Sequence, residues 1–269
     1  MAESRLRDIL SWATQWCDTS GPHRIRAGVE SQCVLIGYPE PTFIVKCFRD
    51  RPGHRRDRCA REYRLLQALC SAVRDERDLT APEPIAMSAE LNAYLMKAVP
   101  GVPLDRAVTG DGRDPVRIAN TLVRGLRAFY EATQEHYGDF QPGNILLSDH
   151  QVAMIDPGGP AYYFDEALAA ASGKRLAADV GYWTFSVVAR SPRSVMESGL
   201  KWKRVLDVTD ALLMIAAQQS TEEMLTRAAW AAGAVHLNRL ASGSARHVAL
   251  AVGSGIALRA WLAAAERRL

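Results

Sequence analysis

The chain has 269 residues, of which 48% are hydrophobic and 23% are charged, and its formal net charge is +3. This composition is typical of a globular protein with one large domain or two lobes around a cleft, and it excludes a disordered or fibrous chain. So small a net charge gives no reason to expect a nucleic-acid partner.

The cysteines and the chain start bear on the compartment. Five cysteines lie at scattered positions without a C-x-x-C pair, and an odd, unpatterned set is typical of reduced thiols in a cytoplasmic protein. The first residues lack the basic-then-apolar pattern of a signal peptide. The most apolar late stretch, residues 248–258, is too short to span a membrane. We therefore expect a cytoplasmic protein without a membrane span, and the sequence leaves its oligomeric state open.

Most of the predicted strands lie in the first hundred residues. Residues 3–17 have apolar side chains at helical spacing, which predicts a helix packed on the nearest lobe rather than on a membrane. A strand is expected to end near Arg26 and turn at Gly28. Two apolar runs, residues 34–36 and 43–45, then flank a segment rich in glycine and proline, which indicates a β-hairpin.

The next segments change from strand to helix. We expect a helix over residues 57–73, a loop at residues 82–84, a strand over residues 93–96, and a helix over residues 115–135 with a stripe that starts at Val116. A short hairpin is predicted over residues 144–155. Residues 176–269 are expected to be helical, with breaks near Pro192 and at residues 242–244. Strands cluster early and helices late, which predicts an α+β fold with two parts, residues 1–97 and 98–269.

The most informative segment runs from Tyr137 to Gly158. It carries Asp139, Asn144 and Asp156 at short intervals, and the predicted hairpin between the last two brings its own ends together. Asp and Asn oxygens are ligands suited to a magnesium ion that also binds phosphates, and a further carboxylate can accept a proton from a hydroxyl group. The alternative for each aspartate alone is ordinary turn chemistry. The whole set favours phosphoryl transfer from a nucleotide.

A cation is expected opposite these oxygens. Lys46 ends an apolar strand, and its side chain points to the face opposite Val45 and Cys47. If that face lines a cleft, Glu62 on the following helix supplies the counter-ion, and the pair holds the nucleotide's phosphates. The alternative for Lys46 is a solvent-exposed lysine on an edge strand.

These residues resemble a known family. Val45-Lys46, Glu62, the Gly138-Asp139-x-x-x-x-Asn144 loop and the Ile155-to-Gly158 segment are similar to the protein-kinase-like phosphotransferases, most closely the aminoglycoside phosphotransferase and choline kinase branch. The resemblance covers roughly residues 24–190. It implies a bilobal protein-kinase-like fold, with a small antiparallel-sheet N-terminal lobe, a mainly helical C-terminal lobe, and ATP between them.

The resemblance also implies roles for individual residues. Asp139 would be the catalytic base, Asn144 and Asp156 the Mg²⁺ ligands, and Lys46 would pair with Glu62. The backbone of Lys97 and Val99 would bind adenine. Asp179 resembles the buried aspartate that braces the catalytic loop, and a helix N-cap is its alternative role.

The sequence departs from the family's pattern in three places. Tyr137 stands where a histidine is usual, so the usual histidine contact is missing. No G-x-G-x-x-G occurs, and the segment from Gly28 to Ser31 is the candidate that would cover the phosphates through backbone N–H groups and the Ser31 hydroxyl. Pro157, which lacks an N–H group, follows the metal aspartate, and we hypothesise that this segment does not flip between two states.

The class of the phosphoryl acceptor is inferred only from the charge of the C-terminal residues. Nine basic and five acidic residues lie between Lys201 and Leu269, and this surplus of base argues against a polycationic aminoglycoside. A neutral or anionic hydroxyl compound fits better, such as a sugar, a nucleoside or a lipid-linked saccharide. We expect an ATP- and Mg²⁺-dependent kinase that phosphorylates a hydroxyl group of a small molecule, which can be a sugar, a nucleoside, an antibiotic or a lipid-linked saccharide. The alternatives are a protein serine/threonine kinase and a nucleotide-binding pseudokinase scaffold. The basic cluster between Arg49 and Arg64 is expected to be a solvated face, and its alternative is a dock for an anionic partner such as RNA or a phosphorylated substrate.

Overall fold

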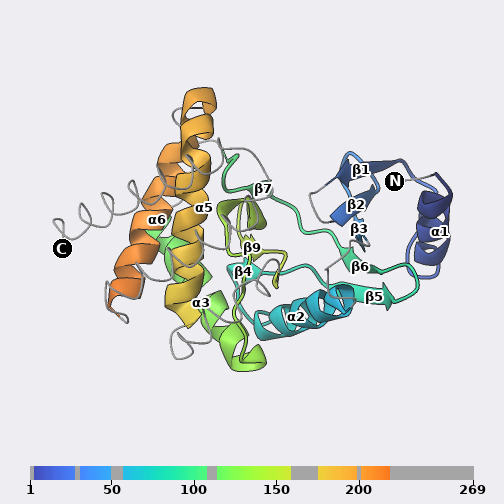
Figure 1. Ribbon diagram of the computed structural model, residues 1–269, viewed down its shortest axis with the longest axis horizontal. Coiled ribbons are helices and arrows are strands. Elements are labelled where there is room, and N and C mark those ends of the chain that lie inside the picture. Colours follow the sequence, from blue (N-terminus) through green and yellow to red (C-terminus); the bar gives the residue numbers. More distant parts are fainter. Residues whose placement is uncertain are drawn as a thin grey trace, which may run out of the picture.

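The computed structural model describes residues 3–27, 31–49, 57–107, 114–158, 175–198 and 201–218. Figure 1 shows two regions: a sheet with helix α1 at one end, and the helices α3, α5 and α6 at the other. Helix α2 (Arg58–Ala72) lies between them. This is the α+β, protein-kinase-like arrangement that the sequence predicts.

A five-stranded antiparallel sheet forms the first region. Its order is β1-β2-β3-β6-β5, and its strands are β1 (His23–Ala27), β2 (Ser31–Ile36), β3 (Phe43–Phe48), β5 (Pro84–Ser88) and β6 (Ala93–Lys97). The predicted hairpin is confirmed, because β2 pairs with β3 from Ile36 opposite Phe43 to Ser31 opposite Phe48. The register places Cys33, Lys46 and Tyr94 in one row across three strands, on one face of the sheet.

The two faces of this sheet have different partners. Helix α1 (Glu3–Ala13) buries Ile9 and Ala13 against Val34, Val45 and other side chains of one face, so the predicted lobe-packing helix is confirmed and ends at Ala13. Full burial of one such aliphatic side chain contributes about 1.5–3 kcal/mol. On the opposite face, Leu66 of α2 packs with Tyr94. Side chains alternate between faces along a strand, so Lys46 lies on the α2 face.

The second region is mainly helical. It contains α3 (Pro115–Thr133), α5 (Arg175–Ser198) and α6 (Lys201–Ala217), which share one large apolar core. Helix α3 begins where the Asp114 side chain accepts a hydrogen bond from the Val116 N–H at 3.0 Å, with Pro115 in the first turn. A small sheet of order β4-β9-β8-β7 lies beside α3; its strands are β4 (Leu79–Thr80), β7 (Val102–Pro103), β8 (Ile145–Leu147) and β9 (Val152–Met154).

Several sequence predictions need correction. The loop expected at residues 82–84 is one residue shorter, because Pro84 begins strand β5 at the sheet edge, where a missing N–H costs little. Helix α5 continues through Pro192, where a break was expected; the proline removes one N–H from the helix without ending it. Val116 is 52% exposed and is not part of the buried stripe. Strands β4 and β7 are too short to leave a pattern in the sequence.

Other predictions fall on residues that the structure does not describe. The turn at Gly28 and the expected break at residues 242–244 lie outside the described residues, as do Arg51, Arg55 and Arg56 of the cluster between Arg49 and Arg64. Within the described part of the chain, no helix has the length and apolarity that a membrane crossing requires.

Candidate active site

Lys46 lies at the centre of a buried ionic cluster. Its Nζ atom donates to Glu62 Oε1 and, at 2.8 Å, to Asp156 Oδ1. Lys46 is 6% exposed and Glu62 is 1% exposed, so the alternative of an exposed edge-strand lysine is wrong. The three residues come from β3, from α2 and from the segment after β9. The cluster therefore joins the two regions of the molecule.

The electrostatics of the cluster keep Lys46 charged. Burial by itself disfavours the ammonium, but Asp156 and Glu62 together raise the pKa of Lys46 above its ordinary value. Burial raises the pKa of the Glu62 carboxyl, and the nearby ammonium opposes that rise. The Tyr94 hydroxyl donates to Glu62 Oε1 at 2.8 Å, which adds a second donor to the oxygen that binds Lys46. A cation held in this way can attract anionic phosphates.

Asp139 and Asn144 lie together on the loop between α3 and β8. The Asn144 Nδ2 donates to Asp139 Oδ2 at 2.8 Å and to the Asp139 carbonyl oxygen at 3.0 Å. These bonds use the amide nitrogen of Asn144, so Oδ1 is the side-chain atom that could bind a cation. Burial, followed by the charge of Asp156, raises the pKa of the Asp139 carboxyl.

The β8–β9 hairpin brings Asn144 and Asp156 together, as the spacing predicts. Ile145 pairs with Met154, and the Ile155 N–H donates to the Asn144 carbonyl oxygen at 3.0 Å. Asp156 has a φ of +60°, in the left-handed region that non-glycine residues rarely adopt. The surrounding structure must hold this residue in place.

Tyr137 anchors the chain on both sides of Asp156. Its hydroxyl donates to the Ile155 carbonyl oxygen at 2.6 Å, and its own carbonyl oxygen accepts from the Gly158 N–H at 2.6 Å. The side chain is fully buried, with its ring 5.5 Å from Phe129 between centroids. The tyrosine thus connects the loop that carries Asp139 to the Asp156 segment, from the position where the resembled family usually has a histidine.

Asp179 braces the same loop from α5. Its Oδ2 accepts from the Tyr137 N–H at 2.9 Å and from the Tyr130 hydroxyl at 2.7 Å, and its Oδ1 accepts from the Gly138 N–H at 2.9 Å. Asp179 is the fifth residue of its helix and is 2% exposed, so the N-cap alternative is wrong. Burial raises the pKa of its carboxyl, an effect that the charge of His136 opposes.

The structure describes three of the four residues that were expected to contact the nucleotide besides Lys46. Ser31 lies opposite Phe48 in the sheet register and therefore on the same face as Lys46, whereas Gly28 lies outside the described residues. Lys97 ends β6, and its N–H donates to the Glu83 carbonyl oxygen at 2.9 Å, so an adenine contact from Lys97 would use its carbonyl oxygen. Val99 follows two residues later, just after the strand.

Three residues at the site were not assigned from the sequence. Tyr94 donates to Glu62, and both Gln141 and Tyr182 donate to Asp139 Oδ1, at 2.8 and 2.9 Å. For Tyr182 a signal was present, because residues three apart lie on one face of a helix and Tyr182 follows Asp179 by three. Tyr94 becomes a neighbour only through strand pairing, which the sequence does not specify.

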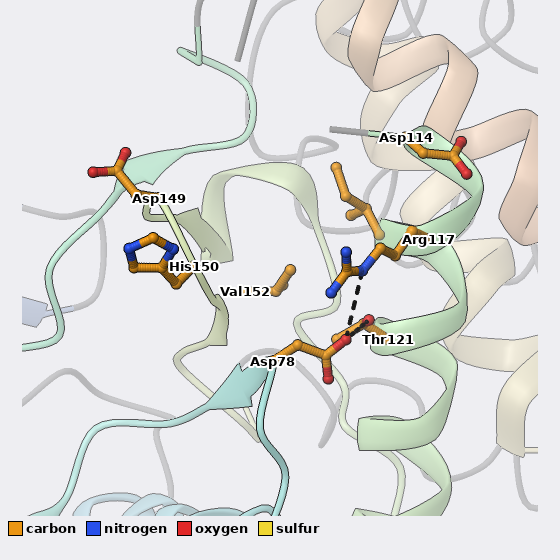
Figure 2. A pocket seen from close by; sticks show the side chains of 8 residues that line it. Asp78, Asp114, Arg117, Thr121, Asp149, His150 and Val152 are labelled. Atoms are coloured by element: carbon orange, nitrogen blue, oxygen red, sulfur yellow. Dashed lines mark hydrogen bonds and ion pairs between the residues drawn. The ribbon is translucent and has the colours of Figure 1, made fainter. Parts of the chain in front are cut away.

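A separate cavity lies at the other end of the hairpin. Figure 2 shows it between the β8–β9 turn, with Asp149 and His150, and the first turns of α3; its volume is about 330 Å³. On its floor, Asp78 accepts a hydrogen bond from Thr121 at 3.0 Å and lies 4.0 Å from the Arg117 guanidinium. Asn144 and Asp156 lie at the open end of this hairpin, so the cavity is not part of their site.

The comparisons with known proteins agree with this geometry. Residues 23–137 match the family model described as APH, phosphotransferase enzyme family. The match covers somewhat less than half of the chain and ends before Asp139. The matched residues include Lys46 and Glu62, so this part of the chain is similar to a phosphotransferase enzyme family. The comparison with curated proteins gave no match.

Solved structures of this fold are similar at low identity. A putative fructosamine-3-kinase from Thermobifida fusca is 16% identical with a TM-score of 0.44, and the alignment covers 89% of this chain and 94% of that one. The Rio2 kinase from Chaetomium thermophilum, in its ADP/Mg²⁺-phosphoaspartate complex, is 17% identical with a TM-score of 0.42, covering 86% and 75%.

Proposed function

We propose that this protein transfers the γ-phosphoryl group of ATP, with Mg²⁺, to a hydroxyl group of a small molecule. One observation carries the proposal: Lys46 is ion-paired at once to Glu62 of α2 and to Asp156 after β9, beside the hydrogen-bonded pair Asp139 and Asn144. A buried cation next to three oxygen-bearing side chains is the arrangement that holds a triphosphate and a hydroxyl acceptor together.

Each residue has a role in this proposal. Asp139 accepts the proton of the acceptor hydroxyl while the oxygen of that hydroxyl forms a bond to the γ-phosphorus. The bond from the γ-phosphorus to the β,γ-bridging oxygen breaks at the same time, and ADP is released. Lys46 offsets the charge of the phosphates, and Glu62 holds Lys46 in place. Gly28 and Ser31 cover the phosphates, and the backbone of Lys97 and Val99 binds adenine.

The residues present fit a magnesium ion. Asn144 and Asp156 offer hard oxygen donors, and Mg²⁺ is usually held by one or two side chains together with phosphate oxygens and water. When bound, the ion supplies positive charge that neutralises the phosphate oxygens. The Lys46 ammonium lies against the Asp156 carboxylate and compensates its charge.

The acceptor is proposed to be a neutral or anionic hydroxyl compound, such as a sugar, a nucleoside or a lipid-linked saccharide. The surplus of basic residues between Lys201 and Leu269 supports this class over polycationic antibiotics. The five free cysteines support a reducing, cytoplasmic location. We further propose that the lobes divide near residue 97, where the last strand of the larger sheet ends.

The test is a transfer assay with γ-labelled ATP and Mg²⁺ against a panel of sugars, nucleosides and antibiotics, preceded by thermal-shift screening, because a ligand raises the melting temperature by mass action. The Asp139→Asn variant should bind MgATP and transfer no label. Label transferred to a protein would assign the chain to the protein kinases. Binding of MgATP without turnover by the wild type would indicate a pseudokinase, and turnover by Asp139→Asn would reject the role of Asp139.

A further inference from the structure

Helix α5 contacts the catalytic loop at two points. Asp179 accepts hydrogen bonds from the loop backbone, and one turn later the Tyr182 hydroxyl donates to Asp139 Oδ1 at 2.9 Å. The first contact fixes the backbone of the loop. The second reaches the carboxylate that we propose as the base.

The hydrogen-bond positions on Asp139 are nearly filled. A carboxylate oxygen has two lone-pair positions. Oδ1 accepts from both Gln141 Nε2, at 2.8 Å, and Tyr182. Oδ2 accepts from Asn144 Nδ2 at 2.8 Å. These three side chains leave one lone-pair position of the carboxylate, on Oδ2, without a donor among them.

We propose that Tyr182 is a positioning residue that, together with Gln141, occupies Oδ1 of Asp139 and so directs Oδ2 toward the acceptor hydroxyl. This inference rests on the proposed phosphotransferase function and adds to it the atom that accepts the proton. A general base must lie within hydrogen-bond reach of the proton that it removes, and a carboxylate free to rotate would present either oxygen.

The burial of Tyr182 supports a role beyond packing. Its neighbours Val180 and Trp183 are fully buried in the large core, whereas Tyr182 is only partly buried. The side chain thus lies at the edge of the core, with its hydroxyl on the carboxylate. Both donors to Oδ1 are neutral groups, so the acceptor side of Asp139 gains no further charge from Tyr182 or Gln141, which suits an uncharged acceptor hydroxyl.

The test compares the Tyr182→Phe variant with the wild type in the full chain. Phenylalanine keeps the ring and removes the one donor. We measure steady-state hydrolysis of MgATP with water as the acceptor. The kcat should fall by about tenfold, the rate equivalent of one hydrogen bond to a charged group, while the KM for MgATP changes by less than about twofold. Gln141→Leu removes the other donor and should lower kcat in the same way. Tyr38→Phe, at an exposed tyrosine, is the matched control.

A second readout is independent of turnover. Crystal structures of wild type and Tyr182→Phe without nucleotide should show the Asp139 carboxylate rotated away from its wild-type orientation in the variant. An unmoved carboxylate in the variant, or a kcat equal to or above that of the wild type, overturns the proposal. A wild type that neither binds nor hydrolyses MgATP would instead reject the phosphotransferase function, and the orientation of Asp139 would still decide the role of Tyr182.

Discussion

Replacement of Tyr137 by phenylalanine tests the connection between the catalytic loop and Asp156. The substitution removes the hydroxyl that donates to the Ile155 carbonyl oxygen at 2.6 Å. It keeps the ring and therefore its contacts with Phe129 and Phe140. The backbone bond from the Gly158 N–H to the Tyr137 carbonyl oxygen also remains. The perturbation is thus confined to one of the two anchors that flank Asp156.

The expected loss of stability in Tyr137→Phe follows from burial and backbone strain. The loss of this donor from the carbonyl oxygen of the half-buried Ile155 costs about 1–3 kcal/mol, because the fully buried ring of Tyr137 leaves water little access to the vacated position. Asp156, at a φ of +60°, is in a conformation that costs a non-glycine residue roughly 1–2 kcal/mol. With one anchor gone, relief of this strain favours release of Asp156. We therefore expect a loss of about 2 kcal/mol in the free energy of unfolding.

Two measurements check this expectation. Thermal unfolding should show a melting temperature lowered by about 4–8 °C, the usual equivalent of 2 kcal/mol in a protein of this size. Isothermal titration calorimetry with MgATP should show weaker binding, because Asp156 is no longer held beside Lys46. Tyr38→Phe, which removes an exposed hydroxyl bonded to Arg24, should change stability by less than about 0.5 kcal/mol. A Tyr137→Phe variant as stable as the wild type, with unchanged MgATP affinity, would refute the reasoning.

Three further predictions concern the buried groups of the site. Lys46→Met should lower the free energy of unfolding by about 3–5 kcal/mol in urea unfolding. Adding Glu62→Leu should recover part of that loss, because it removes the carboxylate that was left unpaired. A double variant that is no more stable than the single variant would contradict this. Asp179→Ala leaves three buried donors without their acceptor, so backbone amide exchange at Tyr137 and Gly138 should accelerate; unchanged exchange would reject the brace. Burial raises the pKa of the Cys33 thiol to about 11, so iodoacetamide should label it slowly at pH 7.5 and faster as the pH approaches 11. MgATP should protect Cys33, which lies in the row of Lys46, and leave the labelling of Cys17 unchanged; equal protection of both would argue against a nucleotide on that face.

The raised pKa of Cys33 also makes the stability of the protein depend on pH. An acid whose pKa is raised in the folded state binds its proton more tightly there, so it contributes stability below the unfolded pKa of about 8.5. That contribution is lost as the pH rises through the folded value of about 11. Urea unfolding of the wild type should therefore show falling stability between these pH values, and a Cys33→Ser variant should show a shallower fall.

Local patterns were sufficient for most of the elements. The apolar spacing of α1, α2 and α3 predicted those helices, and the runs around residue 40 predicted the β2–β3 hairpin. The errors arose where a single residue was given too much weight, as at Pro84 and Pro192, because neighbouring chain segments decide whether a missing N–H matters.

The sequence by itself determined that Asn144 and Asp156 would meet, because a short hairpin places its own ends together whatever surrounds it. Alternation along β3 also put Lys46 on the face opposite Val45. Only the tertiary structure decided that Glu62 and Asp156 bind the same ammonium group, that the Tyr137 hydroxyl donates to the Ile155 carbonyl oxygen, and that Tyr182 reaches Asp139. These contacts join segments that lie 16 to 110 residues apart, and their geometry depends on how β3, α2, α5 and the catalytic loop pack around a shared core.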